Sequence, residues 1–157
     1  MRLAEVLIDD ATWEALGPER RGDLAVDVEA LIAESRFDVG AHGLLRLLVT
    51  FDRERLVVGL CQLDGHIVVQ TLVPLASLEP VMREYLACCR RLAAGPPGRD
   101  ADDLEALDIG KRLIHDEGAD RLARLCGLLH PDHQTARKLF SVVVALRHDA
   151  PNLRALD

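Results

Sequence analysis

Three apolar runs separated by short polar turns constrain the fold of this chain more than any other feature. They are Leu44–Phe51, Leu56–Leu63 and His66–Val73. The first link, Asp52–Arg55, is polar, and the second is the pair Asp64–Gly65. An Asp-Gly pair between apolar runs is typical of a two-residue type I′ hairpin turn, in which both central residues need positive φ. The spacing therefore predicts one antiparallel meander of three strands.

The middle run, Leu56–Leu63, is apolar on both of its alternating faces. A strand of this kind lies inside a sheet that is covered on both sides, or it is covered by a partner subunit. The mean hydropathy is +0.08, although 29% of the residues are charged. We therefore expect self-association, with a two-fold homodimer as the favoured form. The alternative is that four or five helices cover both sides of the sheet within one chain.

Apolar residues at helical spacing predict five longer helices. In the first of them Leu24, Val28 and Leu31 recur at i, i+4 and i+7, which is the stripe of a helix that buries one face. Ser77 is expected to cap the second helix, which ends before Gly95. The first helix is predicted over Glu19–Ser35, and the remaining three over Asp102–His115, Glu117–Leu129 and Asp132–His148.

The order of these elements predicts an α+β fold. A short strand over Arg2–Ile8 and one or two helical turns after Asp10 precede the first long helix. The meander, with this N-terminal strand as a possible fourth, packs against about five helices, and the C-terminal third is helical. We expect residues 1–150 to form a single α+β domain and residues 151–157 to be a short C-terminal tail.

Composition excludes several classes of function. The formal net charge is −7, which argues against binding to nucleic acid or to a membrane surface. No stretch approaches the roughly 20 apolar residues of a membrane span, and the charged residues within Met1–Asp10 argue against a signal peptide. The four cysteines form no CxxC pair, so no zinc ribbon or thioredoxin-like centre is indicated. Reduced cysteines predict a cytoplasmic protein.

The histidines around the start of the last helix raise the question of a metal site. His130 and His133, with His115 or Cys126, are residue types that bind transition metals. A proline and a helix cap separate the first two, so their side chains are expected to diverge. Exposed loop histidines are the favoured interpretation, and we predict neither a metal nor a cofactor.

The predicted helix that ends near His115 carries a charged side. Asp108, Arg112 and His115 project together, because successive residues of a helix turn by about 100°. Gly110 in the middle of this helix costs about 1 kcal/mol relative to alanine, which predicts a close approach of another backbone. Gly118 is expected to end the helix in a left-handed conformation.

Two segments carry a family resemblance. Leu107–Gly118 and Thr135–Phe140 resemble the UPF0262 family, whose members typically read DMGRRGLHNEG and later DTARRLF. Weaker similarity includes Glu34–Phe37, Arg55–Val57 and Tyr85–Cys88. The resemblance implies an uncharacterised, largely alphaproteobacterial family and supplies no catalytic residues. The matching positions are Asp108, Gly110, Arg112, His115, Glu117, Gly118, Thr135, Ala136, Arg137, Leu139 and Phe140. This chain departs from the family pattern at Leu113 and Ile114.

The polar members of this set suggest an anion site. Arg112 and Arg137 together are suited to hold an anion in bidentate fashion, with Asp108 and Thr135 as further candidate ligand-binding residues. Amide groups at the start of the last helix would assist them. The competing interpretation is a polar network that joins two helices and fixes their register.

His115 is the candidate for proton transfer, because histidine titrates near neutral pH. Glu117 is its candidate catalytic partner. We favour a non-enzymatic protein that binds a protein partner or a small anionic ligand through this polar cluster. The alternative is a small hydrolase or transferase acting on an anionic substrate, with His115 as acid–base. No GxSxG, HExxH or Gly-rich phosphate loop decides between them.

Overall fold

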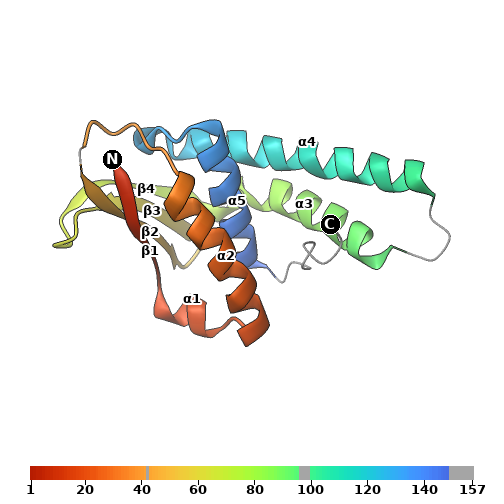
Figure 1. The fold of residues 1–157 in the computed structure, drawn as a ribbon, viewed down its shortest axis with the longest axis horizontal. Coiled ribbons are helices and arrows are strands. Elements are labelled where there is room, and N and C mark those ends of the chain that lie inside the picture. Colours follow the sequence, from red (N-terminus) through yellow and green to blue (C-terminus); the bar gives the residue numbers. More distant parts are fainter. Residues whose placement is uncertain (42, 96–99, 149–157) are drawn as a thin grey trace.

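The computed structural model describes residues 1–41, 43–95 and 100–148, and the predicted tail, residues 151–157, lies outside them. Strands and helices follow the predicted α+β order (Figure 1). The elements are β1 (Arg2–Ile8), α1 (Asp10–Glu14), α2 (Pro18–Glu34), β2 (Leu44–Asp52), β3 (Arg55–Cys61), β4 (Ile67–Pro74), the 3₁₀ turn η1 (Leu75–Ser77), α3 (Glu79–Ala94), α4 (Ala101–Leu125), the 3₁₀ turn η2 (Gly127–Leu129) and α5 (His133–Arg147).

The four strands form one sheet in the order β1-β2-β3-β4. β2 pairs with β3 and β3 with β4 in antiparallel fashion, as the meander predicts. β1 pairs with β2 in parallel, so the sheet is mixed rather than wholly antiparallel. The parallel pairing follows from the connection, because α1 and α2 carry the chain back to the end of the sheet where β1 begins.

The turn between β3 and β4 differs in detail from the predicted type I′ turn. Gly65 N donates to Gln62 O at 2.9 Å, and Gln62 N donates to His66 O at 2.8 Å. Gly65 has a φ of 91°, whereas Asp64 is not among the described residues with positive φ. The link is therefore a longer loop that ends in a left-handed glycine, next to a register shift after Leu60. The aspartate contributes through its side chain, which accepts from His66 N at 2.9 Å.

α2, α5 and the C-terminal end of α4 lie on one face of the sheet, here called the inner face, whereas α3 and the rest of α4 extend together beyond the sheet (Figure 1). On this face Leu56, Val58 and Leu60 of β3 are fully buried. α5 lies between α2 and α4, and its apolar side completes the core. The other side of the sheet, here called the outer face, carries Val57 and Cys61 of the same strand. The helices therefore cover the apolar side chains on the inner face of β3, and they do not cover those on its outer face.

The C-terminal third corrects two helix predictions. The predicted helices Asp102–His115 and Glu117–Leu129 are one helix of 25 residues, α4. Gly118 does not end it: the glycine is helical and buried, and a Cβ atom there would lie within 2.7 Å of three ring atoms of Phe140. The close approach predicted at Gly110 is wrong, because nothing described lies within 4 Å of a Cβ at that position.

The start of α3 also differs from the prediction. Ser77 belongs to the 3₁₀ turn η1, and α3 begins at Glu79 after Leu78, with Pro80 in its first turn. The predicted cap of the last helix is confirmed, since Asp132 accepts from Thr135 N at 2.8 Å. None of the described helices is long and apolar enough to cross a membrane.

Candidate functional site

His115 lies where three helices meet. Its ring on α4 stacks against Tyr85 of α3, with centroids 5.2 Å apart, and contacts Phe140 of α5 at 5.6 Å. Tyr85 and Phe140 in turn meet edge to face. These aromatic contacts hold the imidazole inside the junction between α3, α4 and α5 and limit its access to a substrate.

The imidazole also bonds to α5. His115 Nε2 lies 3.1 Å from Arg137 O and 2.9 Å from Ser141 Oγ. Because a carbonyl oxygen only accepts, this contact places the proton of the neutral ring on Nε2. Burial, and then the charge of Arg137, lower the pKa of His115 from 6.5 to about 4. At neutral pH the ring is therefore uncharged and serves as a donor to the backbone of α5.

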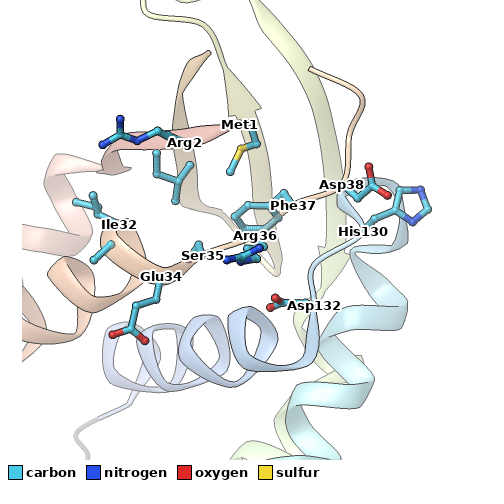
Figure 2. Close-up of a pocket in the computed structure, with 12 residues that line it drawn as sticks. Met1, Arg2, Ile32, Glu34, Ser35, Arg36, Phe37, Asp38, His130 and Asp132 are labelled. Carbon is cyan, nitrogen blue, oxygen red and sulfur yellow. The ribbon is translucent and has the colours of Figure 1, made fainter. Parts of the chain in front are cut away.

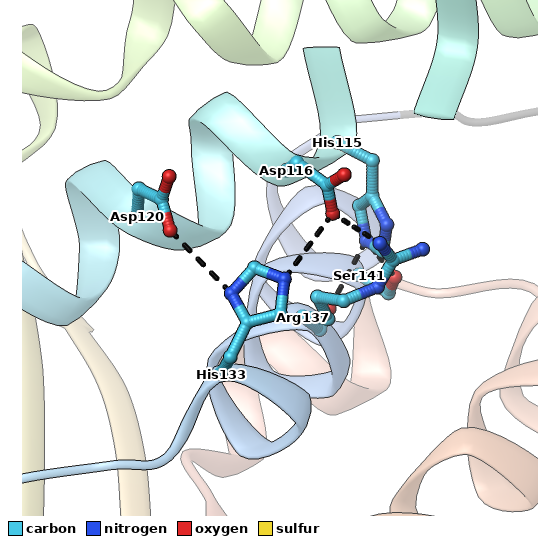
Figure 3. Close-up of polar contacts among 6 residues, drawn as sticks. All are labelled: His115, Asp116, Asp120, His133, Arg137 and Ser141. Carbon is cyan, nitrogen blue, oxygen red and sulfur yellow. Dashed lines mark hydrogen bonds and ion pairs between the residues drawn. The ribbon is translucent and has the colours of Figure 1, made fainter. Parts of the chain in front are cut away.

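Ion pairs beside the imidazole extend the contact between α4 and α5 (Figure 3). Arg137 pairs with Asp116, the residue after His115. His133 lies between two carboxylates of α4, with Nε2 3.4 Å from Asp116 Oδ1 and Nδ1 3.4 Å from Asp120 Oδ1. We call these groups, with His115 and Ser141, the α4–α5 network.

The remaining candidates from the sequence form local pairs on α4. Arg112 pairs with Asp108 four residues earlier, and Glu117 Oε1 lies 3.2 Å from Arg121 Nη2. Arg112 and Arg137 thus engage different carboxylates. Of the candidate residues, the structure brings His115 and Arg137 together. Sequence reasoning missed Asp116, Ser141 and His133 as members of the network, although the i, i+4 spacing of Asp116 and Asp120 was a signal for a shared partner.

Thr135, the remaining candidate, is fully buried at the start of α5. Its hydroxyl accepts from Arg36 N at 2.8 Å. Two further backbone bonds tie the same segments: Asp132 N donates to Arg36 O at 3.2 Å, and Asp38 N donates to His130 O at 3.1 Å. Thr135 therefore positions the chain that follows α2 and does not itself face an open site.

The segment that follows α2, residues 35–38, forms one wall of a hollow of about 900 Å³, which we call the Arg36 hollow (Figure 2). The start of β1, the end of α2 and the loop before α5 supply its other walls. Arg36 lies near its centre, whereas the guanidinium of Arg2 lies at the β1 side. Asp38 and His130 lie next to one another at the opposite side.

Ser35 gives the Arg36 hollow its most unusual feature. The residue is 9% exposed, and its hydroxyl has no hydrogen-bond partner among the described residues. A buried polar group left in this state costs about 1–3 kcal/mol. No described carboxylate lies within ion-pair distance of the exposed Arg36 guanidinium. The positive charge of Arg36 instead acts on Asp132. Burial raises the pKa of Asp132, but hydrogen bonds from Thr135 and the charge of Arg36 outweigh burial, so the pKa is lowered overall.

Sequence reasoning missed the Arg36 hollow as a site. Its residues come from segments far apart in the chain, and each is an ordinary residue type in its local context. The one available signal was the family similarity of Glu34–Phe37, a segment with no buried stripe or cap of its own to explain it.

Metal and thiol chemistry find little support in the described part of the chain. No group of three or more His, Cys, Asp or Glu side chains there is arranged to hold a metal ion. Burial raises the pKa of Cys126 to about 12 and also raises that of Cys89. Neither thiol is therefore activated as a nucleophile.

Comparisons with known proteins agree with one another. Residues 1–149 match the model of a family described as uncharacterised protein family UPF0262. A UPF0262 protein of Mesorhizobium japonicum is 33% identical over 148 residues, which cover 89% of this chain and 91% of that protein. UPF0262 proteins of Brucella abortus and Methylobacterium radiotolerans are 32% and 29% identical, and each alignment covers 92% of both chains. No solved structure matches the chain.

Proposed function

Because this chain belongs to the UPF0262 family, whose description supplies no activity, we propose from its own geometry that it is a non-enzymatic protein that binds a small anionic ligand in the Arg36 hollow. One observation carries the proposal: the unpaired hydroxyl of Ser35 is buried beside the guanidinium of Arg36 in a hollow of about 900 Å³. A ligand that accepts from the hydroxyl removes the cost of leaving it unbonded. A phosphate or carboxylate group suits both partners.

The α4–α5 network has a different role in this proposal. It fixes α4 on α5, and Thr135 at the start of α5 fixes the backbone of Arg36. The residues that resemble the family motifs thus position the hollow rather than bind the ligand. The hydrolase alternative requires His115 to exchange protons with a substrate, and the aromatic contacts and lowered pKa of this ring favour the packing role.

We also propose that the protein works in the cytoplasm and as a homodimer. Its four free cysteines, three of them buried, support the first inference, because thiols stay reduced in that compartment. The sheet face that no long helix covers supports the second.

Anion titration tests the proposed function. We expect inorganic phosphate, citrate or ADP to stabilise the protein, with a rise in melting temperature of about 5–10 °C for the best of them at one hundred times its Kd. Arg36→Gln should abolish this rise, and Ser35→Ala should reduce it. Arg112→Gln is the matched control, because it removes a guanidinium that is paired on α4.

The variants separate the possible results. Stabilisation that survives Arg36→Gln but disappears with Arg112→Gln would place the anion on α4 and contradict the proposal. Absence of any saturable shift with the three probes would also contradict it. Calorimetric titration of the wild-type protein gives the stoichiometry, for which we expect one anion per chain.

A further inference from the structure

A short antiparallel bridge joins two walls of the Arg36 hollow. Phe37, in the segment after α2, pairs with Pro131, in the loop before α5. One backbone hydrogen bond flanks the pair on each side, at 3.2 and 3.1 Å. His130 ends η2 in a left-handed conformation, with a φ of 45°, where the chain turns back toward residues 36–38. The pairing therefore fixes which side chains of the two segments lie together.

Two pairs of polar side chains flank this bridge on its exposed side. Side chains alternate along an extended segment, so Arg36 and Asp38 project to the side opposite Phe37, which is buried. Across the bridge, Asp132 lies opposite Arg36, and His130 lies opposite Asp38. Figure 2 shows Asp38 and His130 next to one another. All four of these side chains are exposed, so they are open to a ligand in the hollow.

The opposite charges on this side of the bridge do not neutralise one another through contacts. None of the described residues forms a hydrogen bond or an ion pair with the Asp38 carboxylate. Arg36 acts on Asp132 through its charge, but the two do not form an ion pair. Glu34 differs, because its Oε2 lies 2.9 Å from Lys138 Nζ. The hollow thus presents a cation and a carboxylate whose Cα atoms lie roughly 7 Å apart along one extended segment.

This arrangement suits a ligand that carries both signs of charge. A molecule with anionic groups alone would pair with Arg36 but would be repelled by Asp38 and Asp132. A molecule with an ammonium group beside its anionic group would pair with Asp38 as well. The volume of about 900 Å³ lies within the range of sites that hold organic ligands. The hollow therefore has room for both groups and for the atoms that join them.

From this geometry we propose that the ligand of the Arg36 hollow is a small zwitterion, an amino-phosphate or an amino-carboxylate. Its anionic group binds Arg36 and the hydroxyl of Ser35, and its ammonium group binds Asp38. The inference rests on the proposed function, because it takes the anion site at Arg36 as its starting point. It adds the second charge of the ligand and the carboxylate that recognises it.

Calorimetric titration with matched pairs of compounds tests the proposal. 2-Aminoethyl phosphate and ethyl phosphate differ only in the ammonium group, as do 3-aminopropionate and propionate. In the pair that the wild-type protein binds more tightly, we expect the amino compound to have a dissociation constant about fivefold lower, the upper range for an ion pair open to solvent. Asp38→Asn should abolish this preference without weakening the binding of the compound that lacks the amine. Circular dichroism checks that each variant is folded.

Glu84→Gln is the matched control and should keep the preference, because Glu84 is an exposed carboxylate on α3 outside the hollow. Equal affinities within both pairs would overturn the inference and leave the proposed anion site in place. A preference that survives in folded Asp38→Asn would overturn it too, and loss of that preference in Asp132→Asn instead would move the ammonium group to Asp132. Failure of the wild-type protein to bind any of the four compounds would contradict the proposed function, and the inference with it.

Discussion

Replacing Gly118 with alanine is expected to lower the free energy of unfolding by about 2–3 kcal/mol, whereas the same change at Gly110 in the same helix should raise it by about 1 kcal/mol. The opposite signs follow from what surrounds each glycine. A methyl group at Gly118 meets the ring of Phe140 at distances that no real Cβ atom tolerates, and the ring is fully buried in the core. A methyl group at Gly110 enters open space and gains only helix propensity.

Urea unfolding of the two single variants measures both effects. A double-mutant cycle with Phe140→Leu isolates the contact: the smaller side chain leaves room, so Gly118→Ala should cost less in that background by at least 1 kcal/mol. Equal effects of alanine at the two positions would show that Gly118 is not the close contact between α4 and α5. A stabilised Gly118→Ala variant would contradict the packing of the two helices.

The two glycines also show where sequence reasoning reaches its limit. It recognised that a glycine inside a helix needs an explanation, but it assigned the close approach to Gly110 and a helix end to Gly118. Nothing in the segment that follows stops a helix, because Ala119–Leu125 contains neither proline nor glycine. Which glycine faces another helix depends on where α5 crosses α4. Tertiary packing sets that crossing point, and the local spacing of residues along the sequence does not predict it.

Strands were easier to predict than the site. Short turns between apolar runs leave few topologies, so the β2–β3–β4 meander was predictable from Leu44–Val73 alone. The parallel pairing of β1 was not, since it depends on where the chain returns after α2. A bidentate anion clamp was a reasonable hypothesis for Arg112 and Arg137, but each arginine has a nearer carboxylate, Asp108 and Asp116 respectively.

The Arg36 hollow could not be predicted for a related reason. Its Ser35 and Arg36 carry no motif of their own, and the walls opposite them come from β1 and from the loop before α5. A buried hydroxyl without a partner becomes visible only when every neighbour is placed. Sequence patterns report periodic burial, whereas a site of this kind is defined by one unsatisfied group in an aperiodic segment.

Acidification should destabilise the folded protein through His115. Its pKa is lowered to about 4 in the folded state, from 6.5 for an unperturbed side chain. As the pH falls below 6.5, His115 binds a proton in the unfolded chain, whereas in the folded protein it stays neutral until the pH approaches 4. The contribution to stability is therefore complete above pH 6.5 and is lost as the pH falls toward 4. The loss amounts to about 2–3 kcal/mol at 1.4 kcal/mol per pKa unit, allowing for partial exposure of the ring.

Unfolding curves from pH 7.5 to 4.5 test this expectation, with His115→Gln as the variant that cannot titrate. At neutral pH we expect the variant to be less stable by about 1–3 kcal/mol, since it loses the ring contacts with Tyr85 and Phe140 and disturbs the bond to α5. Over the acidic range its curve should fall less steeply than that of the wild type, so the two should converge. His66→Gln provides the control for the substitution itself, because the His66 side chain is exposed on the hairpin turn and outside the core. Parallel wild-type and His115→Gln curves would mean that His115 takes up its proton equally in both states, and the ring would then belong in solvent rather than between Tyr85 and Phe140.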